Sequence, residues 1–292
     1  MSLSTTCLAL LLLTVADPNP MAYPKADLLV EPAELAKSIR ANAYLLLDAR
    51  GKGKYDEGHV PGSVVVDPVA WARAFGNGDD KDAWTKRIGE LGIDADSKVV
   101  IYDDAQLKDA ARIWWILRYW GVKDVRLLNG GWKGWVAVDG PMEKTASQPK
   151  LVTPKLSALS DRLATKKQIM DVLKDKPPQL VDSRSTGEFC GTEETAKRNG
   201  SMPGAVHLEW SDTLDKKTGR FKSADELTKL FKEAGIDPTK PAVTYCQSGG
   251  RAAVMAFALE LMGGKEVRNY YRSWSEWGNA EETPIVKPKG KE

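Results

Sequence analysis

Short apolar runs bounded by Asp, Gly or Pro alternate along the chain with stretches in which apolar residues recur at helical spacing. The stretches 32–40 and 224–234 show the helical period. The run 44–47 is apolar throughout and 242–245 is apolar except for Thr244, which is typical of strands buried on both faces. Such strands, separated by helices, predict a parallel sheet flanked by helices. The expected fold class is therefore α/β.

This pattern occurs twice, and the two halves can be aligned. Asp48 and Arg50 close the first apolar run as Asp-x-Arg, and Asp182 and Arg184 close its counterpart. The second half carries an insertion at 189–199. Four blocks return in the same order: 44–50 as 179–184, 58–62 as 200–204, 91–102 as 234–245, and 125–135 as 267–277. A repeat of this size indicates a tandem duplication, hence two similar α/β domains.

Composition shifts give the domain boundaries. Between the copies the chain lacks either period and is rich in proline, which is typical of a linker. We expect a signal peptide or tail at 1–22, a first domain at 23–142, a linker at 143–159, a second domain at 160–286 and a tail at 287–292.

The N-terminus holds an apolar run at 7–16, which is too short to span a bilayer as a helix. Its length fits the apolar core of a secretory signal, with Ala16 or Ala22 as a small residue before a cleavage point. No Lys or Arg precedes the run. We expect a periplasmic or secreted protein without a membrane span, and a cytoplasmic protein with an N-terminal tail is the alternative.

Charge and cysteine content exclude several classes of function. The 292 residues hold 42 Lys and Arg against 40 Asp and Glu, a formal charge of +2, without a basic block that could follow a phosphate backbone. No nucleic-acid partner is expected. The three cysteines and two histidines form no CxxC pair or Cys/His cluster, so neither a metal site nor another cofactor is expected.

The candidate chemistry lies where the two copies differ most. After its strand at 242–245 the second copy reads Cys-Gln-Ser-Gly-Gly-Arg, whereas the first copy has Asp103 at the aligned position. The candidate residues are Cys246, Gln247, Ser248, Gly249, Gly250 and Arg251. They follow the carboxyl end of a strand, where open parallel sheets bind ligands, and a helix is expected to begin near Arg251. The loop N–H groups, the helix N-terminus and Arg251 are expected to favour a thiolate over a thiol.

Three other side chains have competing interpretations. A free cysteine is often only a small buried hydrophobe, but the polar neighbours of Cys246 argue against that. Cys190, in the inserted segment, is interpreted as structural, with resolution of an oxidised Cys246 as the alternative. His59 aligns with Ser201 and has no active cysteine in its own copy, and His207 aligns with Val65, so both histidines are interpreted as structural.

Taken together, the motifs resemble those of the tandem rhodaneses, the thiosulfate/3-mercaptopyruvate sulfurtransferase family. They are Asp-x-Arg, Gly-[His/Ser]-x-Pro-Gly, Cys-x-x-Gly-x-Arg and a closing Trp-x-x-Trp block, and the resemblance covers about residues 28–286. It implies a catalytically silent first domain, consistent with Asp103. It also implies a second domain whose cysteine cycles through a persulfide.

Departures from the family pattern bear on the substrate. The loop of animal thiosulfate enzymes resembles Cys-Arg-Lys-Gly-Val-Thr and that of mercaptopyruvate enzymes resembles Cys-Gly-Ser-Gly-Val-Thr, whereas this loop ends in Arg251. Both animal types have an arginine where this chain has Glu188, and the loss of that cation counts against a carboxylate-bearing donor. Arg251 is expected to hold the departing sulfite. Arg184 is expected to support the loop through an ion pair with Asp182 or Glu188, with a direct substrate role as the alternative.

The expected function is transfer of sulfane sulfur from thiosulfate to cyanide or a thiol through a Cys246 persulfide. One alternative is a 3-mercaptopyruvate sulfurtransferase. Another is a binding module that carries a persulfide to a protein acceptor. A cysteine-dependent phosphatase is less favoured, because Cys246 and Arg251 are separated by four residues rather than the five that wrap a tetrahedral phosphate.

Overall fold

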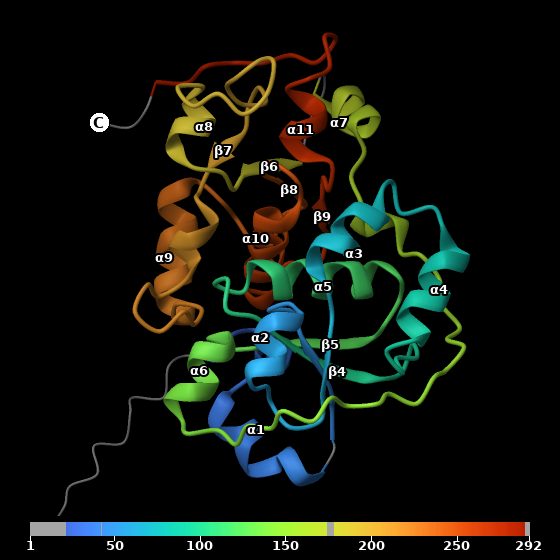
Figure 1. Cartoon of the computed structure of the whole chain (residues 1–292). Helices are drawn as coiled ribbons and strands as arrows, with labels where there is room; N and C mark the ends of the chain where they lie inside the picture. Colours follow the sequence, from blue (N-terminus) through green and yellow to red (C-terminus); the bar gives the residue numbers. More distant parts are fainter. Residues whose placement is uncertain (1–21, 42, 174–177, 290–292) are drawn as a thin grey trace, which may run out of the picture.

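The first half of the chain folds around a five-stranded parallel sheet in the computed structural model, which describes residues 22–41, 43–173 and 178–289 (Figure 1). The strand order is β1-β5-β4-β2-β3. The strands are β1 (Leu29–Val30), β2 (Leu45–Asp48), β3 (Ser63–Val65), β4 (Lys98–Tyr102) and β5 (Asp124–Leu128). The helices are α1 (Pro32–Ser38), α2 (Lys52–Glu57), α3 (Pro68–Phe75), α4 (Lys81–Gly89), α5 (Lys108–Tyr119) and α6 (Gly131–Ala137).

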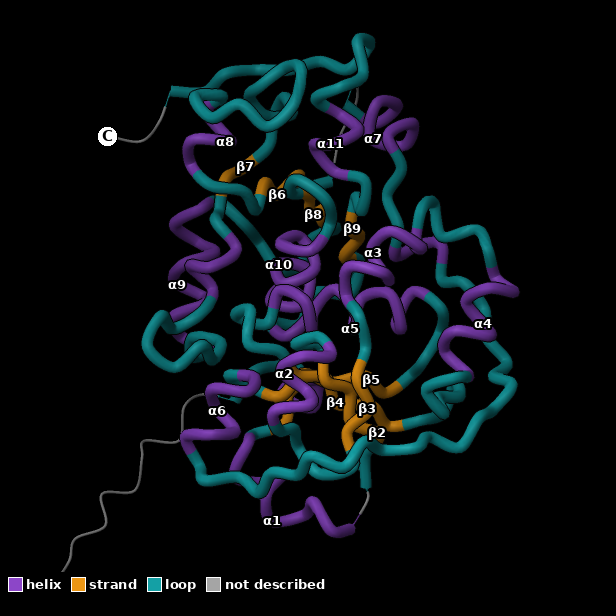
Figure 2. Tube along the Cα trace, viewed as in Figure 1, coloured by secondary structure: helices purple, strands orange, loops and turns teal. Residues whose placement is uncertain are grey.

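The second half repeats this plan with four parallel strands in the order β7-β6-β8-β9 (Figure 2). The strands are β6 (Gln179–Asp182), β7 (Val206–His207), β8 (Ala242–Tyr245) and β9 (Val267–Asn269). The helices are α7 (Lys166–Val172), α8 (Thr186–Cys190), α9 (Ala224–Ala234), α10 (Gly250–Leu261) and α11 (Ser273–Trp277). Both sheets order their equivalent strands alike, so the predicted α/β fold with two parallel sheets flanked by helices is confirmed.

Local sequence signals explain where the helices begin and end. The Ser223 hydroxyl accepts from the Glu226 N–H and the Glu226 side chain accepts in return, a capping box that starts α9. Gly235, in the left-handed region at φ 76°, ends the helix where the period predicted. The other predicted stretch, 32–40, is helical only to Ser38 and then tightens into a 3₁₀ turn at Ile39–Ala41.

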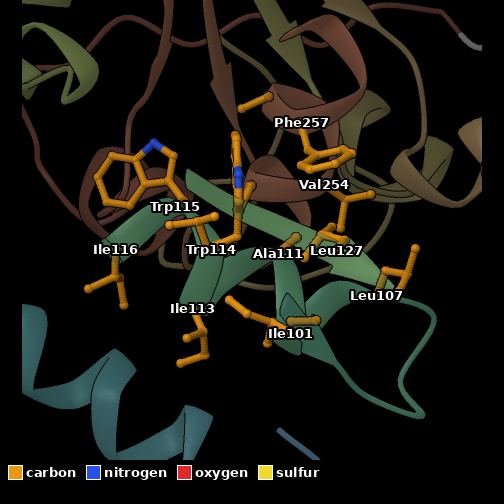
Figure 3. Packing of buried hydrophobic residues seen from close by; sticks show 14 of the residues in the cluster. Ile101, Leu107, Ala111, Ile113, Trp114, Trp115, Ile116, Leu127, Val254 and Phe257 are labelled. Carbon is orange, nitrogen blue, oxygen red and sulfur yellow. The ribbon is translucent and has the colours of Figure 1, made fainter. Parts of the chain in front are cut away.

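Helices α5 and α10 pack against each other where the two halves meet. The rings of Trp114 on α5 and Phe257 on α10 meet edge to face with centroids 4.9 Å apart, and Val254 lies beside them (Figure 3). These side chains belong to one apolar cluster that continues into both halves. Burial of this seam brings the N-terminus of α5 close to the loop that precedes α10.

The connecting segment 143–159 follows the surface of the first half. The Val152 N–H donates to the Gly89 carbonyl at 3.1 Å, and the Leu159 N–H donates to the Tyr119 carbonyl at 2.7 Å. The apolar run 7–16 and Ala16 lie outside the described residues, so the predicted signal segment stays an expectation. Within the described ranges, no helix is long and apolar enough to cross a membrane.

Candidate active site

Cys246 lies directly after β8, at the carboxyl end of the second sheet, and four residues before the first residue of α10. Its backbone N–H donates to Ser273 Oγ at 3.1 Å, and its carbonyl accepts from the Trp274 N–H at 2.9 Å. The residue is only 1% exposed. Both backbone partners come from the start of α11, so the position of the thiol is fixed by two neighbouring elements of the sheet edge.

One loop amide points at the sulfur. The Gly249 N–H donates to Cys246 Sγ across 3.1 Å. Gly249 adopts φ 82°, and a Cβ at this position would lie 2.7 Å from the Tyr271 carbonyl oxygen, so only glycine fits. Of the predicted anion-binding loop, one N–H donor points at the sulfur, where it would stabilise a negative charge.

Arg251 makes a bidentate ion pair with Glu188. Its Nη1 and Nη2 atoms lie 2.5 and 2.8 Å from the two carboxylate oxygens, and the two side chains are 22% and 6% exposed. Burial alone would raise the pKa of Glu188, but the Arg251 hydrogen bonds and charge outweigh it and lower that pKa. Burial lowers the pKa of Arg251, and Glu188 together with the Cys246 thiolate raises it by more. The pair is therefore fully ionised near the sulfur.

A helix cap holds Glu188 in place. Its side chain accepts from the Ser185 N–H at 3.1 Å, while the Ser185 hydroxyl accepts from the Glu188 N–H, which forms a capping box at the start of α8. The sequence pattern suggested Arg184 as a possible partner of Glu188. Of the two carboxylates expected for Arg184, the structure shows Asp182, and the partner of Glu188 is Arg251, which folding across the sheet edge brings to it.

Arg184 is enclosed within the second half instead. Its guanidinium binds both Asp182 oxygens and the Gly200 carbonyl, and it stacks at 4.2 Å over the Trp274 ring. The side chain is completely buried. Arg50 makes the same set of contacts in the first half, with Asp48, the Gly58 carbonyl and Trp132. Because the arrangement recurs in the half without a cysteine, these contacts of Arg184 serve to support the fold.

The remaining predicted loop residues have distinct contacts. Gln247 Nε2 donates to the Thr195 carbonyl at 2.9 Å, which ties the inserted segment to the loop. Ser248 is exposed, and its carbonyl accepts from Arg112 Nη1 of α5 at 2.8 Å. Gly250 lacks a Cβ where one would collide with the Arg112 guanidinium. Sequence reasoning missed Arg112, since nothing in its local pattern links it to the loop.

Asp103 occupies the cysteine position of the first half and fills the equivalent loop with its own carboxylate. Four backbone N–H groups donate to it at 2.8 to 3.1 Å. They belong to Ala105, Leu107, Asp109 and Ala110. Burial outweighs these donors and raises the pKa of Asp103 to about 6. The first loop is closed around an internal anion and offers no nucleophile.

Neither histidine faces the sulfur. His59 is buried, stacks on Tyr55 and bonds the carbonyls of Tyr55 and Thr145. His207 ends β7 and bonds the Arg184 carbonyl. Cys190 ends α8, two residues after Glu188, and is half-buried. Within the described ranges, no group of three or more His, Cys, Asp or Glu side chains could hold a metal ion.

A cavity of about 550 Å³ reaches the loop at the seam between the halves. Four basic side chains line it together with Ser248 and Tyr271, namely Arg73, Lys108, Arg112 and Arg272. A cavity of about 420 Å³ lies at the opposite edge of the second sheet, beside Pro241 and Gln179. Only the first is near the chemistry, because Cys246 follows the other end of β8.

The chain is similar in sequence to proteins of one known family. The model of the rhodanese-like domain matches residues 31–138 and 165–280. The thiosulfate sulfurtransferase of Azotobacter vinelandii is 30% identical over 267 residues, covering 90% of this chain and 98% of the relative. That of Corynebacterium glutamicum is 34% identical over 248 residues, covering 79% and 80%.

Solved structures show the same fold. The crystal structure of the 3-mercaptopyruvate sulfurtransferase SseA from Escherichia coli aligns with a TM-score of 0.72 and 27% identity, covering 85% of this chain and 98% of SseA. The enzyme EanB with ergothioneine aligns with a TM-score of 0.81 at 23% identity, covering 91% of this chain and 71% of EanB, and this likeness concerns the fold alone. With both halves matched and relatives of this identity over nearly the whole chain, the protein belongs to the rhodanese family of sulfurtransferases and carries two rhodanese-like domains.

Proposed function

We propose that the protein is a thiosulfate sulfurtransferase that acts through a persulfide on Cys246. The observation that carries this proposal is the Gly249 N–H on Cys246 Sγ, in a loop that opens α10. A donor fixed on the sulfur stabilises the thiolate before reaction and the anionic outer sulfur after it. No histidine is required as a base, which agrees with the positions of His59 and His207.

The reaction has two balanced steps. The Cys246 thiolate attacks the outer sulfur of thiosulfate, a bond forms between Sγ and that sulfur, and the bond to the sulfonyl sulfur breaks with its electron pair leaving as sulfite. Cyanide or a thiolate then attacks the outer persulfide sulfur and releases the Cys246 thiolate. Thiocyanate or a new persulfide is the second product.

Electrostatics favours a small dianionic donor. The seam cavity is lined by four basic side chains, Arg73, Lys108, Arg112 and Arg272, and one carboxylate, Asp109, so its net positive charge attracts an anion toward the Ser248 side of the loop. Arg251 is bound to Glu188, so it contributes an oriented ion pair rather than a free cation. A donor with a carboxylate would meet Glu188 where a cation is needed, and this disfavours mercaptopyruvate. The curated relatives from Azotobacter vinelandii and Corynebacterium glutamicum are named for thiosulfate, which supports the same choice.

Mercaptopyruvate is the second candidate donor, since SseA aligns over almost its whole length. A persulfide carrier that serves only a protein acceptor is the third possibility. Turnover with cyanide or a small thiol would show that the protein is an enzyme rather than a carrier that serves only a protein acceptor. The ratio of kcat/KM values for the two donors separates the enzymes from each other.

Intact-mass spectrometry after thiosulfate treatment tests the proposal. We expect a gain of about one sulfur atom, removable by cyanide, in the wild type and in Cys190→Ser. Cys246→Ser should gain nothing. An unchanged mass in the wild type, or a gain that persists in Cys246→Ser, would contradict the mechanism. A higher kcat/KM with mercaptopyruvate than with thiosulfate would reassign the donor.

A further inference from the structure

A residue of the non-catalytic half touches the catalytic loop. Arg112, in the first turns of α5, is 9% exposed and donates from Nη1 to the Ser248 carbonyl at 2.8 Å and to the Tyr271 hydroxyl at 3.0 Å. Its guanidinium also lies 5.5 Å from the Tyr271 ring centroid. A Cβ on Gly250 would lie 2.4 Å from Arg112 Nη2, which shows how closely the guanidinium approaches the loop.

The contacted carbonyl and the amide on the sulfur belong to one peptide unit. The Ser248 carbonyl and the Gly249 N–H are the two ends of the same planar group, and in a trans peptide they point in opposite directions. A donor that holds the carbonyl outward therefore holds the N–H inward. Here the outward end binds Arg112 and the inward end lies 3.1 Å from Cys246 Sγ.

This peptide unit needs such support because its second residue is glycine. Reversal of the unit changes ψ of Ser248 and φ of Gly249, and glycine accepts both signs of φ at little cost. Reversal would aim a carbonyl at the sulfur and oppose the thiolate. Asn269 Nδ2, from the same half, donates to the Gly249 carbonyl at 3.0 Å. The Ser248 carbonyl is held instead by Arg112, from the other half of the chain.

We propose that Arg112 is a positioning residue for the sulfur transfer: it holds the Ser248–Gly249 peptide so that its N–H faces Cys246. This inference rests on the proposed function only for its effect on turnover. Its effect on the resting thiolate stands independently. The charge on Arg112 also polarises the amide it binds, which strengthens the N–H donor at the other end.

Other titratable and charged groups near Cys246 must be considered when its alkylation is measured against pH. Glu188 and Arg251 form their pair on the α8 side, and the Tyr271 hydroxyl lies on the seam side with Arg112. The pKa of Glu188 is lowered, while burial raises that of Tyr271 against the opposing effect of Arg112. A lowered carboxyl pKa and a raised phenol pKa keep both of these groups in one protonation state between pH 6 and 9.

The experiment measures the rate of Cys246 alkylation by iodoacetamide against pH, without any sulfur donor, in a background that carries Cys7→Ser and Cys190→Ser. Arg112→Met keeps an unbranched stem without donors and should raise the alkylation midpoint by about one pH unit. Its kcat/KM for thiosulfate should fall about tenfold. Arg112→Lys, which can donate one bond to the Ser248 carbonyl, should shift the midpoint by less than Arg112→Met.

Arg162→Met is the matched control. Arg162 lies in the same seam, where it binds Glu260 at 2.7 Å and covers the Trp114 ring, at the end of α10 away from the loop. It should keep the wild-type midpoint. If it shifts the midpoint as much as Arg112→Met does, general loosening of the seam explains the effect and the proposal fails.

Thermal unfolding shows which variants are folded. If Arg112→Met does not fold, Arg112→Gln, whose amide is too short to reach the Ser248 carbonyl, provides the same comparison. A raised midpoint supports the proposal, and a wild-type midpoint in a folded variant overturns it. Persulfide formation in the wild type is scored separately, so a protein that takes no sulfur from thiosulfate could still show the midpoint shift.

Discussion

Asp103 and Cys246 occupy the same position in the two halves of the molecule. Each follows an inner strand of its sheet, β4 or β8, and each carbonyl accepts from the N–H of the aligned tryptophan, Trp132 at 2.8 Å and Trp274 at 2.9 Å. What differs is the group inside the loop, a carboxylate surrounded by four N–H groups in one half and a thiol facing one N–H in the other. The two loops share their place in the fold and differ in the side chain that they surround.

Asp103 makes the stability of the protein depend on pH. Burial raises the pKa of Asp103 to about 6, above its value in the unfolded chain, so the folded state holds this proton more tightly. The free energy of unfolding should therefore fall as pH rises from about 4 to about 6, by about 3 kcal/mol from this group. Denaturant titrations across that range should show the slope in the wild type and lose it in Asp103→Asn. Equal slopes in both proteins would sink this assignment.

Glu188 neutralises the charge of Arg251 by forming an ion pair with it. Glu188→Gln keeps a side chain that can complete the capping box with Ser185 but removes the negative charge, leaving Arg251 free to attract an anion. We expect the KM for thiosulfate to fall by about 3- to 10-fold. Ser185→Ala removes the cap and keeps both charges, so it should lower stability without lowering KM. A KM for Glu188→Gln that stays at the wild-type value would mean that the pair does not influence donor binding.

Removal of Arg251 alone should be more harmful than removal of the whole pair. Arg251→Ala leaves Glu188, 6% exposed, as an unpaired anion near the sulfur. It should lower kcat/KM by about 10- to 150-fold and raise the pH at which Cys246 alkylates. The double variant Arg251→Ala with Glu188→Gln should recover part of both losses, because the orphaned charge is gone. Kinetics of the double-mutant cycle measure this coupling, and strictly additive effects would contradict it.

Arg184 and Arg50 should behave alike in stability measurements. Each is paired with a fully buried aspartate, Asp182 or Asp48, and each stacks on a tryptophan. Replacement of either arginine by alanine should cost about 3–5 kcal/mol in the free energy of unfolding. Below the melting temperature both folded variants should still form the persulfide. Loss of persulfide in Arg184→Ala with an unchanged melting temperature would restore a direct substrate role.

Substitution of two glycines that have nearly the same positive φ distinguishes the cost of backbone strain from the cost of a steric clash. Gly235, at φ 76°, faces open space, whereas Gly249, at φ 82°, faces the Tyr271 carbonyl. Gly235→Ala should cost about 1 kcal/mol in stability and leave turnover intact. Gly249→Ala should lose turnover as well, since the loop must move to relieve the contact and its N–H then leaves the sulfur. Equal turnover in the two variants would argue against a requirement for this loop geometry.

The amino-acid sequence by itself determined the fold class, the duplication and the place of Cys246 after its strand, because these depend on local and periodic signals. Apolar runs specify buried strands, the capping box and Gly235 bound α9, and the strand, loop and helix around Cys246 follow from adjacent residues. Comparison of the two copies also exposed Asp103 as the residue that takes the place of the cysteine in the first half. The family membership expected from these motifs is confirmed.

Only the tertiary structure decided which charges meet. Arg251 pairs with Glu188 across 63 positions, and Arg112 reaches Ser248 across 136, distances over which no residue pattern specifies a partner. Long flexible side chains find their partners only after the sheets have placed α8, α5 and α10 around one edge. The orientation of the Ser248–Gly249 peptide depends on such a contact, because a glycine-containing loop accepts either orientation until a neighbouring group selects one.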